Sequence, residues 1–163
     1  MIYSTNINLA LTGGVGASLK EKFGVKLQIG LQSSSLGTGR QMAGVGEVIE
    51  TSFDYMPWKI VFHTIATDEF YYTSPDDVET ILKFCIKRCA SDERIKKVVT
   101  SALGAGYGDL KLSKFIEICD RILSQVDTGA LGEFCIVCND EKEYLKLLEV
   151  SENFGQAWSE IGE

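Results

Sequence analysis

Short apolar strand patterns alternate with amphipathic helical patterns along most of this chain of 163 residues. The stretches WKIVFHTIA (58–66) and IKKVVTSA (95–102) have the continuous apolar character of buried strands. Between them, the apolar residues from Val78 to Cys89 repeat at spacings of three and four, as on one face of a helix. Strands separated by amphipathic helices predict crossover connections and a largely parallel sheet covered on both faces. We therefore expect a three-layer α/β/α sandwich.

The expected order of elements is a strand, a helix, an undecided segment, two strands, and then helix, strand, helix, strand and helix. The undecided segment is 25–44, whose first half has helical character and whose Ser/Gly-rich half is typical of a loop. The adjacent strands at 45–51 and 58–65 are expected to pair antiparallel, which would make the sheet mixed but mostly parallel. We expect a single domain over 1–150, followed by a C-terminal tail at 151–163.

Two helices have specific signals. The run SPDD (74–77) predicts a helix start, with Ser74 as N-cap, proline at the first helical position and acids in the first turn. The next helix is expected to bury one face. That face consists of Leu112, Ile116, Cys119 and Leu123.

The charge of the chain argues against nucleic acid as a partner. Lys and Arg number 16 and Asp and Glu 23, for a net charge of −7, so little is gained from counterion release. A small anionic ligand is still possible, because backbone N–H groups can attract an anion locally. No signal-peptide pattern and no long apolar run occurs, so we expect a cytoplasmic protein without membrane association.

The cysteines do not indicate a disulfide framework or a metal site. They are odd in number, and the one C-x-x-C pair, Cys135 and Cys138, falls in a strand pattern that would point them to opposite faces. Buried, reduced thiols fit an intracellular protein. We expect no metal and no cofactor.

Two glycine-rich loops each follow a strand and precede a helix. They are TGGVGA (12–17) and GAGYG (104–108). In an open α/β sheet, ligands bind outside the carboxyl ends of the strands, where such loops lie. Glycine lets a phosphate approach the backbone closely, so two such loops could hold a diphosphate from both sides, although either alone could be a plain turn. Neither loop has the spacing of a dinucleotide-binding fingerprint, and no Gly-Lys-Ser/Thr of a P-loop occurs.

Four segments, in order, resemble blocks of the macro domain family. They are STNINLALTGGVGASLKEKFG (4–24), GVGEVIETSFDYMPWKIVFHTIA (44–66), VVTSALGAGYGDLKLSKFIEICDRIL (98–123) and EFCIVCNDEKEY (133–144). The resemblance implies a module that binds ADP-ribose, free or attached to protein.

The resemblance also implies which residues contact the ligand. Asn6 would contact the distal ribose, and Gly13, Gly14 and Val15 would wrap the distal ribose and the diphosphate. The second loop would donate backbone N–H groups to the phosphates, with Tyr107 covering the sugar and Asn139 bordering the adenine. That second loop comprises Ser101, Ala102, Leu103, Gly104, Ala105, Gly106 and Tyr107.

The chain departs from the family pattern in two ways. The family opens with an extra strand and an Asp that holds the adenine amino group, whereas this chain starts at the following strand. Hydrolytic members carry an Asp where this chain has Gly16, or a His where it has Leu11. Both departures remove groups that the family uses, the first for adenine selectivity and the second for activating water.

These features leave three functions open. The first is binding of ADP-ribose or an ADP-ribosyl group with little or no turnover. The second is weak hydrolysis of ADP-ribosylated protein or of ADP-ribose 1″-phosphate, with Asn6 as a catalytic residue that orients water. The third is a degenerate domain that acts as a protein-interaction module. The single histidine, His63, is expected to be a structural strand residue, and Asp109 is either an acid/base group or, more simply, a turn residue.

Overall fold

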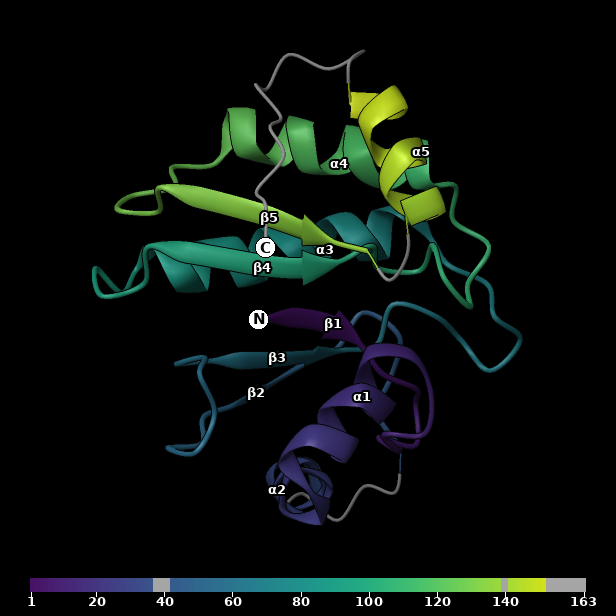
Figure 1. Cartoon of the computed structure of the whole chain (residues 1–163), viewed down its shortest axis with the longest axis vertical. Helices are drawn as coiled ribbons and strands as arrows, with labels where there is room; N and C mark the ends of the chain where they lie inside the picture. Colours follow the sequence, from purple (N-terminus) through teal and green to yellow (C-terminus); the bar gives the residue numbers. More distant parts are fainter. Residues whose placement is uncertain (37–41, 139–140, 152–163) are drawn as a thin grey trace.

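The computed structural model of the chain describes residues 1–36, 42–138 and 141–151. Strands and helices alternate along it (Figure 1). The elements are β1 (Ile2–Ser4), α1 (Gly14–Phe23), α2 (Val25–Leu36), β2 (Val48–Thr51), β3 (Val61–Thr64), α3 (Pro75–Ala90), β4 (Lys97–Ser101), α4 (Leu112–Gln125), β5 (Glu133–Val137) and α5 (Glu141–Ser151).

The strands form a mixed sheet in the order β2-β3-β1-β4-β5. β1 pairs in parallel with both β3 and β4, and β4 pairs in parallel with β5. β2 is antiparallel to β3, with Ile49 opposite His63. The expected antiparallel pair and the mostly parallel mixed sheet are therefore confirmed. The carboxyl ends of β1, β3, β4 and β5 share one edge of the sheet, because these four strands run in the same direction.

Helices cover both faces of the sheet, which confirms the α/β/α sandwich. α1 and α2 lie together on one side of the strands in Figure 1, and α4 and α5 lie on the opposite side. The alternation of side chains along β1 separates two apolar layers. Ile2 belongs to the layer that contains α3 and α4, and Tyr3 belongs to the layer that contains α1 and α2.

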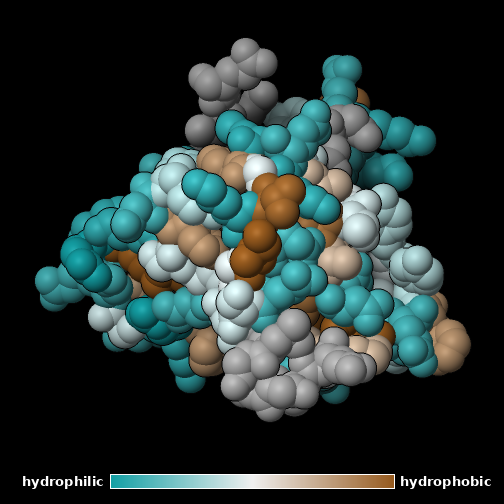
Figure 2. Space-filling model, turned by 90° about the horizontal axis from the view of Figure 1, so that it is seen from below, coloured by the Kyte–Doolittle hydropathy of each residue, from teal (hydrophilic) through white to brown (hydrophobic). Residues whose placement is uncertain are grey.

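The first half of the undecided segment is helical, as α2. α2 carries apolar side chains both on the side that faces the core and on the side that faces solvent. Leu27 and Leu31 are buried, whereas Val25 and Ile29 are exposed. Figure 2 looks onto the side of the molecule where α2 lies and shows hydrophobic atoms exposed near the middle of this surface.

The two specific helix predictions are confirmed in part. α3 begins at Pro75 with Ser74 as its N-cap, but the Ser74 side chain makes no capping hydrogen bond. The buried face of α4 includes the expected Ile116 and Cys119, together with Phe115, Ile118 and Ile122. Of the four residues expected to form this face, Leu112 and Leu123 are only half-buried, because the helix turns a neighbouring row of side chains toward α3.

Chemical features outside the sheet edge are few in the described part of the chain. None of the five cysteines, all of which lie in the described ranges, is in a disulfide, and Cys85, Cys89 and Cys119 are buried. No group of three or more potential metal ligands occurs among the residues that were described. Of the described helices, none is both long enough and apolar enough to cross a membrane.

Candidate functional site

A cavity of about 580 Å³ lies at the carboxyl ends of the parallel strands. Its lining residues come from the ends of β1, β3, β4 and β5, from both glycine loops and from the start of α5. They are Ser4, Thr5, Asn6, Ala10, Thr12, Gly13, Gly14, Val15, Gly16, Thr67, Asp68, Tyr71, Ser101, Ala102, Gly104, Gly106, Tyr107, Gly108, Val137 and Glu143. The two loops identified in the sequence therefore belong to one site.

The first glycine loop ends in the N-terminus of α1, which borders the cavity. The first backbone hydrogen bond of this helix runs from the Ala17 N–H to the Gly13 carbonyl, at 3.2 Å. The N–H groups of Gly14, Val15 and Gly16 precede it and have no intrahelical partner. No acidic residue occupies the first turn of α1. This end of the cavity therefore carries the partial positive charge of a helix N-terminus.

The second glycine loop also presents backbone donors. The Ala105 N–H closes a turn onto the Ala102 carbonyl at 3.1 Å, and the Leu110 N–H donates to the Gly104 carbonyl at 3.1 Å. Among the hydrogen bonds of the described residues, none is donated by the N–H groups of Gly106, Tyr107 or Gly108. Successive backbone N–H groups without protein partners form the type of concavity that binds anions.

Tyr107 links the two loops. A β-carbon added at Gly13 would lie 3.4 Å from Tyr107 Cε2, and one at Gly14 would lie 3.5 Å from the same atom. The ring therefore lies against the backbone of the first loop while remaining 73% exposed. The Tyr107 ring therefore forms one wall of the cavity, beside Gly13 and Gly14.

Side chains hold the first loop in shape. The Asn6 side-chain amide donates to the Ala10 carbonyl and accepts from the Ala10 N–H, both at 3.0 Å. Gln28 of α2 also contacts this loop. Its Oε1 accepts a hydrogen bond from the Leu11 N–H at 2.7 Å, and its Nε2 donates one to the Leu9 carbonyl at 2.6 Å. Leu9 has a φ of 55°, an unfavourable backbone conformation for leucine that these bonds help to maintain.

Thr73 and Asp109 hold the second loop. Asp109 Oδ1 accepts a hydrogen bond from the Thr73 N–H at 2.8 Å, so this carboxylate links the second loop to the segment before α3, and it does not line the ligand cavity. Thr73 packs against Gly104 and Gly108 so closely that a β-carbon at either glycine would collide with its side chain. Gly104 also has a φ of 71°, which only glycine adopts without strain.

The charged groups at the cavity are carboxylates, Asp68 and Glu143, and its described lining contains no lysine or arginine. Asp68 Oδ1 accepts from the N–H groups of Phe70 and Tyr72, both at 2.9 Å. An anion in this cavity would therefore be held by backbone N–H groups rather than by a basic side chain.

His63 lies outside the cavity, in the core. Its Nδ1 hydrogen bonds with the Tyr3 hydroxyl at 2.5 Å and its Nε2 with Thr51 Oγ1 at 2.7 Å. Burial, aided by the charge of the N-terminal amine, lowers the pKa of His63 to about 3. The imidazole is therefore neutral at physiological pH and is a structural strand residue.

The structure brings together most of the residues expected to contact a ligand. Asn6, Gly13, Gly14, Val15, Ser101, Ala102, Gly104, Gly106 and Tyr107 line the cavity. Leu103 and Ala105 do not; Leu103 is fully buried in the core. Asn139 falls outside the described residues.

Sequence reasoning missed Thr67, Asp68 and Tyr71, which follow β3 and line the cavity. A signal was present, because their segment comes directly after a buried parallel strand, as the glycine loops do. It was overlooked because the segment contains no glycine.

Gly16, where hydrolytic family members carry an acid, is in a crowded position. A β-carbon there would lie 3.3 Å from Leu11 Cδ2 and 3.5 Å from Tyr3 Cε2. Leu11 and Tyr3 are themselves buried. The packing beneath the first loop therefore suits glycine at this position, and a carboxylate would require its neighbours to move.

Comparisons with known proteins agree with this architecture. The family model described as Macro domain matches residues 2–119. The structure is similar to that of a single-substitution mutant of the Oceanobacillus iheyensis macrodomain with ADPR, with a TM-score of 0.74, 16% identity and coverage of 93% of this chain and 84% of that chain. It is also similar to the Trypanosoma brucei macrodomain in complex with ADP-ribose, with a TM-score of 0.69, 19% identity and coverage of 91% and 62%.

A third similar structure is the macrodomain of Thermus aquaticus DarG, with a TM-score of 0.64, 16% identity and coverage of 85% of this chain and 87% of that chain. No curated protein matches the chain significantly. At these identities the structural likeness shows the fold, whereas the family match extends over well over half of the sequence. The chain belongs to the macro domain family.

Proposed function

We propose that this domain binds ADP-ribose, free or as an ADP-ribosyl group on a protein, through its two glycine-rich loops. The observation that carries the proposal is the pair of backbone donor groups, at Gly14–Gly16 and at Gly106–Gly108, that border one cavity. Donors on two sides of a cavity suit a diphosphate, which has charged oxygens on both phosphorus atoms. Macrodomains of similar structure are described with ADPR and in complex with ADP-ribose.

The rest of the ligand can be placed along the sheet edge. With the diphosphate over β1 and β4, the distal ribose would lie near Asn6 and Tyr107, and the adenine would lie toward the end of β5, near Val137. The exposed aromatic ring of Tyr107 would cover the sugar and exclude water from the phosphates. The Asn6 amide retains a second N–H and a second lone pair for a ribose hydroxyl.

The arrangement favours binding over turnover. Asn6 is engaged with Ala10, Gly16 lies where packing disfavours an acid, and His63 is buried away from the cavity. Asp68, the carboxylate near the expected distal ribose, uses one oxygen to hold its own loop. Hydrolysis would therefore depend on a water activated by the phosphates of the ligand itself.

Calorimetry with ADP-ribose tests this function. We expect saturable heat with ADP-ribose and much weaker binding of AMP, which lacks the second phosphate. Absence of binding at millimolar ADP-ribose would overturn the proposal and favour a protein-interaction module. Incubation with ADP-ribosylated protein and with ADP-ribose 1″-phosphate distinguishes a hydrolase from a binding module. Release of ADP-ribose or of phosphate well above the rate in buffer would show hydrolysis.

A further inference from the structure

Three consecutive aromatic side chains are exposed beside the ligand cavity. Phe70, Tyr71 and Tyr72 have 80%, 60% and 58% of their surfaces exposed, in the loop between β3 and α3. Single exposed aromatic residues are ordinary, whereas three in succession, none of them in either core cluster, form the kind of exposed apolar surface at which proteins contact other molecules. We call residues 68–72 the aromatic loop.

The aromatic loop is held in one conformation by its own hydrogen bonds. The Asp68 carboxylate accepts from the N–H groups of Phe70 and Tyr72. The Asp68 N–H donates to the Tyr72 carbonyl at 3.0 Å, and the Tyr71 N–H donates to the Asp68 carbonyl at 3.2 Å. Tyr71 has a φ of 66°, which is strained for an aromatic residue. The backbone of the loop is therefore held in one conformation, which reduces the entropy lost on binding.

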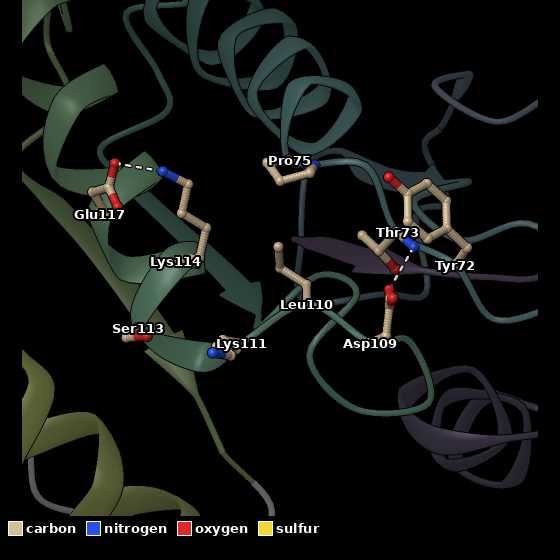
Figure 3. A pocket seen from close by; sticks show the side chains of 9 residues that line it. All are labelled: Tyr72, Thr73, Pro75, Asp109, Leu110, Lys111, Ser113, Lys114 and Glu117. Atoms are coloured by element: carbon tan, nitrogen blue, oxygen red, sulfur yellow. Dashed lines mark hydrogen bonds and ion pairs between the residues drawn. The ribbon is translucent and has the colours of Figure 1, made fainter.

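The aromatic loop stands between two cavities. Tyr71 lines the ligand cavity, whereas Tyr72 lines a second cavity of about 490 Å³. Figure 3 shows this second cavity, with Tyr72 on one side, Lys111 and Lys114 on the α4 side, and Leu110 and Pro75 between them. A molecule that extends out of the ligand cavity past Tyr71 would cross the aromatic loop and enter the second cavity.

The position of the loop along the sheet edge indicates which part of the ligand is near it. The ligand cavity runs from the end of β3, at Thr67 and Tyr71, to the end of β5, at Val137. On the proposed function, which this inference requires, the adenine lies at the β5 end and the distal ribose at the opposite end. The atom through which ADP-ribose is attached to a carrier therefore faces the aromatic loop.

The charges around the loop indicate the chemistry of that carrier. The segment 67–78 contains four carboxylates and no lysine or arginine. Glu69 beside the rings and Asp109 at the second cavity are exposed. The cations of that cavity lie on its α4 side, away from Tyr72: Lys114 is paired with Glu117 at 2.7 Å, and Lys111 is exposed (Figure 3). Carboxylates with exposed aromatic rings attract arginine and lysine, which also stack on such rings, and they repel the phosphates of a nucleic acid.

We propose that the aromatic loop and the Tyr72 side of the second cavity bind the polypeptide that carries the ADP-ribosyl group, with preference for a segment rich in arginine or lysine. Phe70 and Tyr72 are the specificity-determining residues, since they contact the carrier and not the ADP-ribosyl group. The domain would then distinguish protein-linked ADP-ribose from the free nucleotide.

Titrations with four ligands test this surface. The ligands are free ADP-ribose, an arginine-flanked peptide that carries ADP-ribose through a linkage water does not cleave, the same peptide with glutamate flanks, and an oligonucleotide that carries ADP-ribose. We expect the wild-type chain to bind the arginine-flanked peptide at least about fivefold more tightly than free ADP-ribose, on the scale of one or two cation–π contacts. Equal affinities, or tightest binding of the oligonucleotide, would overturn the proposal.

The double variant Phe70→Ser/Tyr72→Ser isolates the loop. We expect it to lose the preference for the arginine-flanked peptide while its affinity for free ADP-ribose stays unchanged. Phe84→Ser is a matched control, because Phe84 is an exposed aromatic residue of α3 that lines neither cavity; it should retain the preference. A double variant that keeps the preference, or that loses affinity equally for free ADP-ribose and for the arginine-flanked peptide, would show that the aromatic loop does not recognise the carrier polypeptide. Failure of the wild-type chain to bind free ADP-ribose would instead refute the proposed function of the ligand cavity.

Discussion

The ring of Tyr107 lies against Gly13, although the two residues belong to loops that are far apart in the sequence. This contact joins the glycine loops across the cavity. Because the ring is mostly exposed, Tyr107→Ser should change the free energy of unfolding by no more than about 0.5 kcal/mol. It should weaken ADP-ribose binding about tenfold, since the sugar loses an aromatic cover. Calorimetry measures the affinity; Tyr107→Phe, the control, should bind as the wild type does.

A charge placed at Gly106 should block the phosphate site. A β-carbon at Gly106 would meet no atom within 4 Å, so the chain accepts a side chain there without disturbing the fold. Gly106→Glu should lower ADP-ribose affinity by at least about 100-fold, because like charges in close proximity repel by a few kcal/mol at a protein surface. Gly106→Gln has the same shape without the charge and should lose about tenfold or less. Similar losses in the two variants would contradict an anion site at this loop.

The close packing of Thr73 on Gly104 should appear as energetic coupling. Gly104→Ala should destabilise the fold by about 2–4 kcal/mol, because alanine is strained at this φ and its β-carbon collides with Thr73. In a Thr73→Ala background the same substitution should cost less, since part of the collision is removed. Chemical denaturation of the four proteins gives this coupling energy. Additive effects would show that the two residues are not in contact.

Gln28 should position the first loop without contacting the ligand. Gln28→Leu removes the hydrogen bonds to Leu9 and Leu11 and should lower the free energy of unfolding by about 1–3 kcal/mol. The loop would then sample other conformations, so the affinity for ADP-ribose should fall as well. Lys26→Leu, on the exposed side of the same helix, should leave both quantities unchanged. A Gln28 variant with normal affinity would show that the loop keeps its shape without this clamp.

The buried histidine should make the fold less stable in mild acid. The pKa of His63 is lowered to about 3 in the folded chain, whereas an unfolded histidine titrates near pH 6.5. Below about pH 6.5 the unfolded state therefore binds a proton that the folded state does not, and stability falls by at most about 1.4 kcal/mol per pH unit. His63→Gln should flatten this dependence between pH 5 and pH 6.5, where ordinary carboxylates remain ionised.

The same histidine can be observed directly, because it is the only one in the chain. Its imidazole signals in NMR spectra should not shift between pH 5 and pH 8 while the protein is folded. A titration near pH 6.5 in the folded state would show that His63 is accessible to water.

Much of the fold could be predicted from local patterns. The apolar stripe of α3 and the continuous run of β3 depend on periodicities of the chain itself, so neither required knowledge of tertiary contacts. The glycines of both loops could be recognised for a similar reason, since strand–glycine–helix is a local arrangement. The buried face of α4 includes the expected Ile116 and Cys119 but also Phe115, Ile118 and Ile122, because neighbouring rows of that helix are both apolar and only packing on α3 selects among them.

The sequence by itself determined most of the strands and helices, α2 excepted, and where two loops could receive an anion, because those properties reside in short stretches of chain. Only the tertiary structure decided that Tyr107 lies on Gly13, that Gln28 clamps the loop from α2, and that the aromatic loop stands beside the ligand cavity. These relationships join residues distant in sequence, and they exist because parallel strands bring their carboxyl ends to one edge of the sheet.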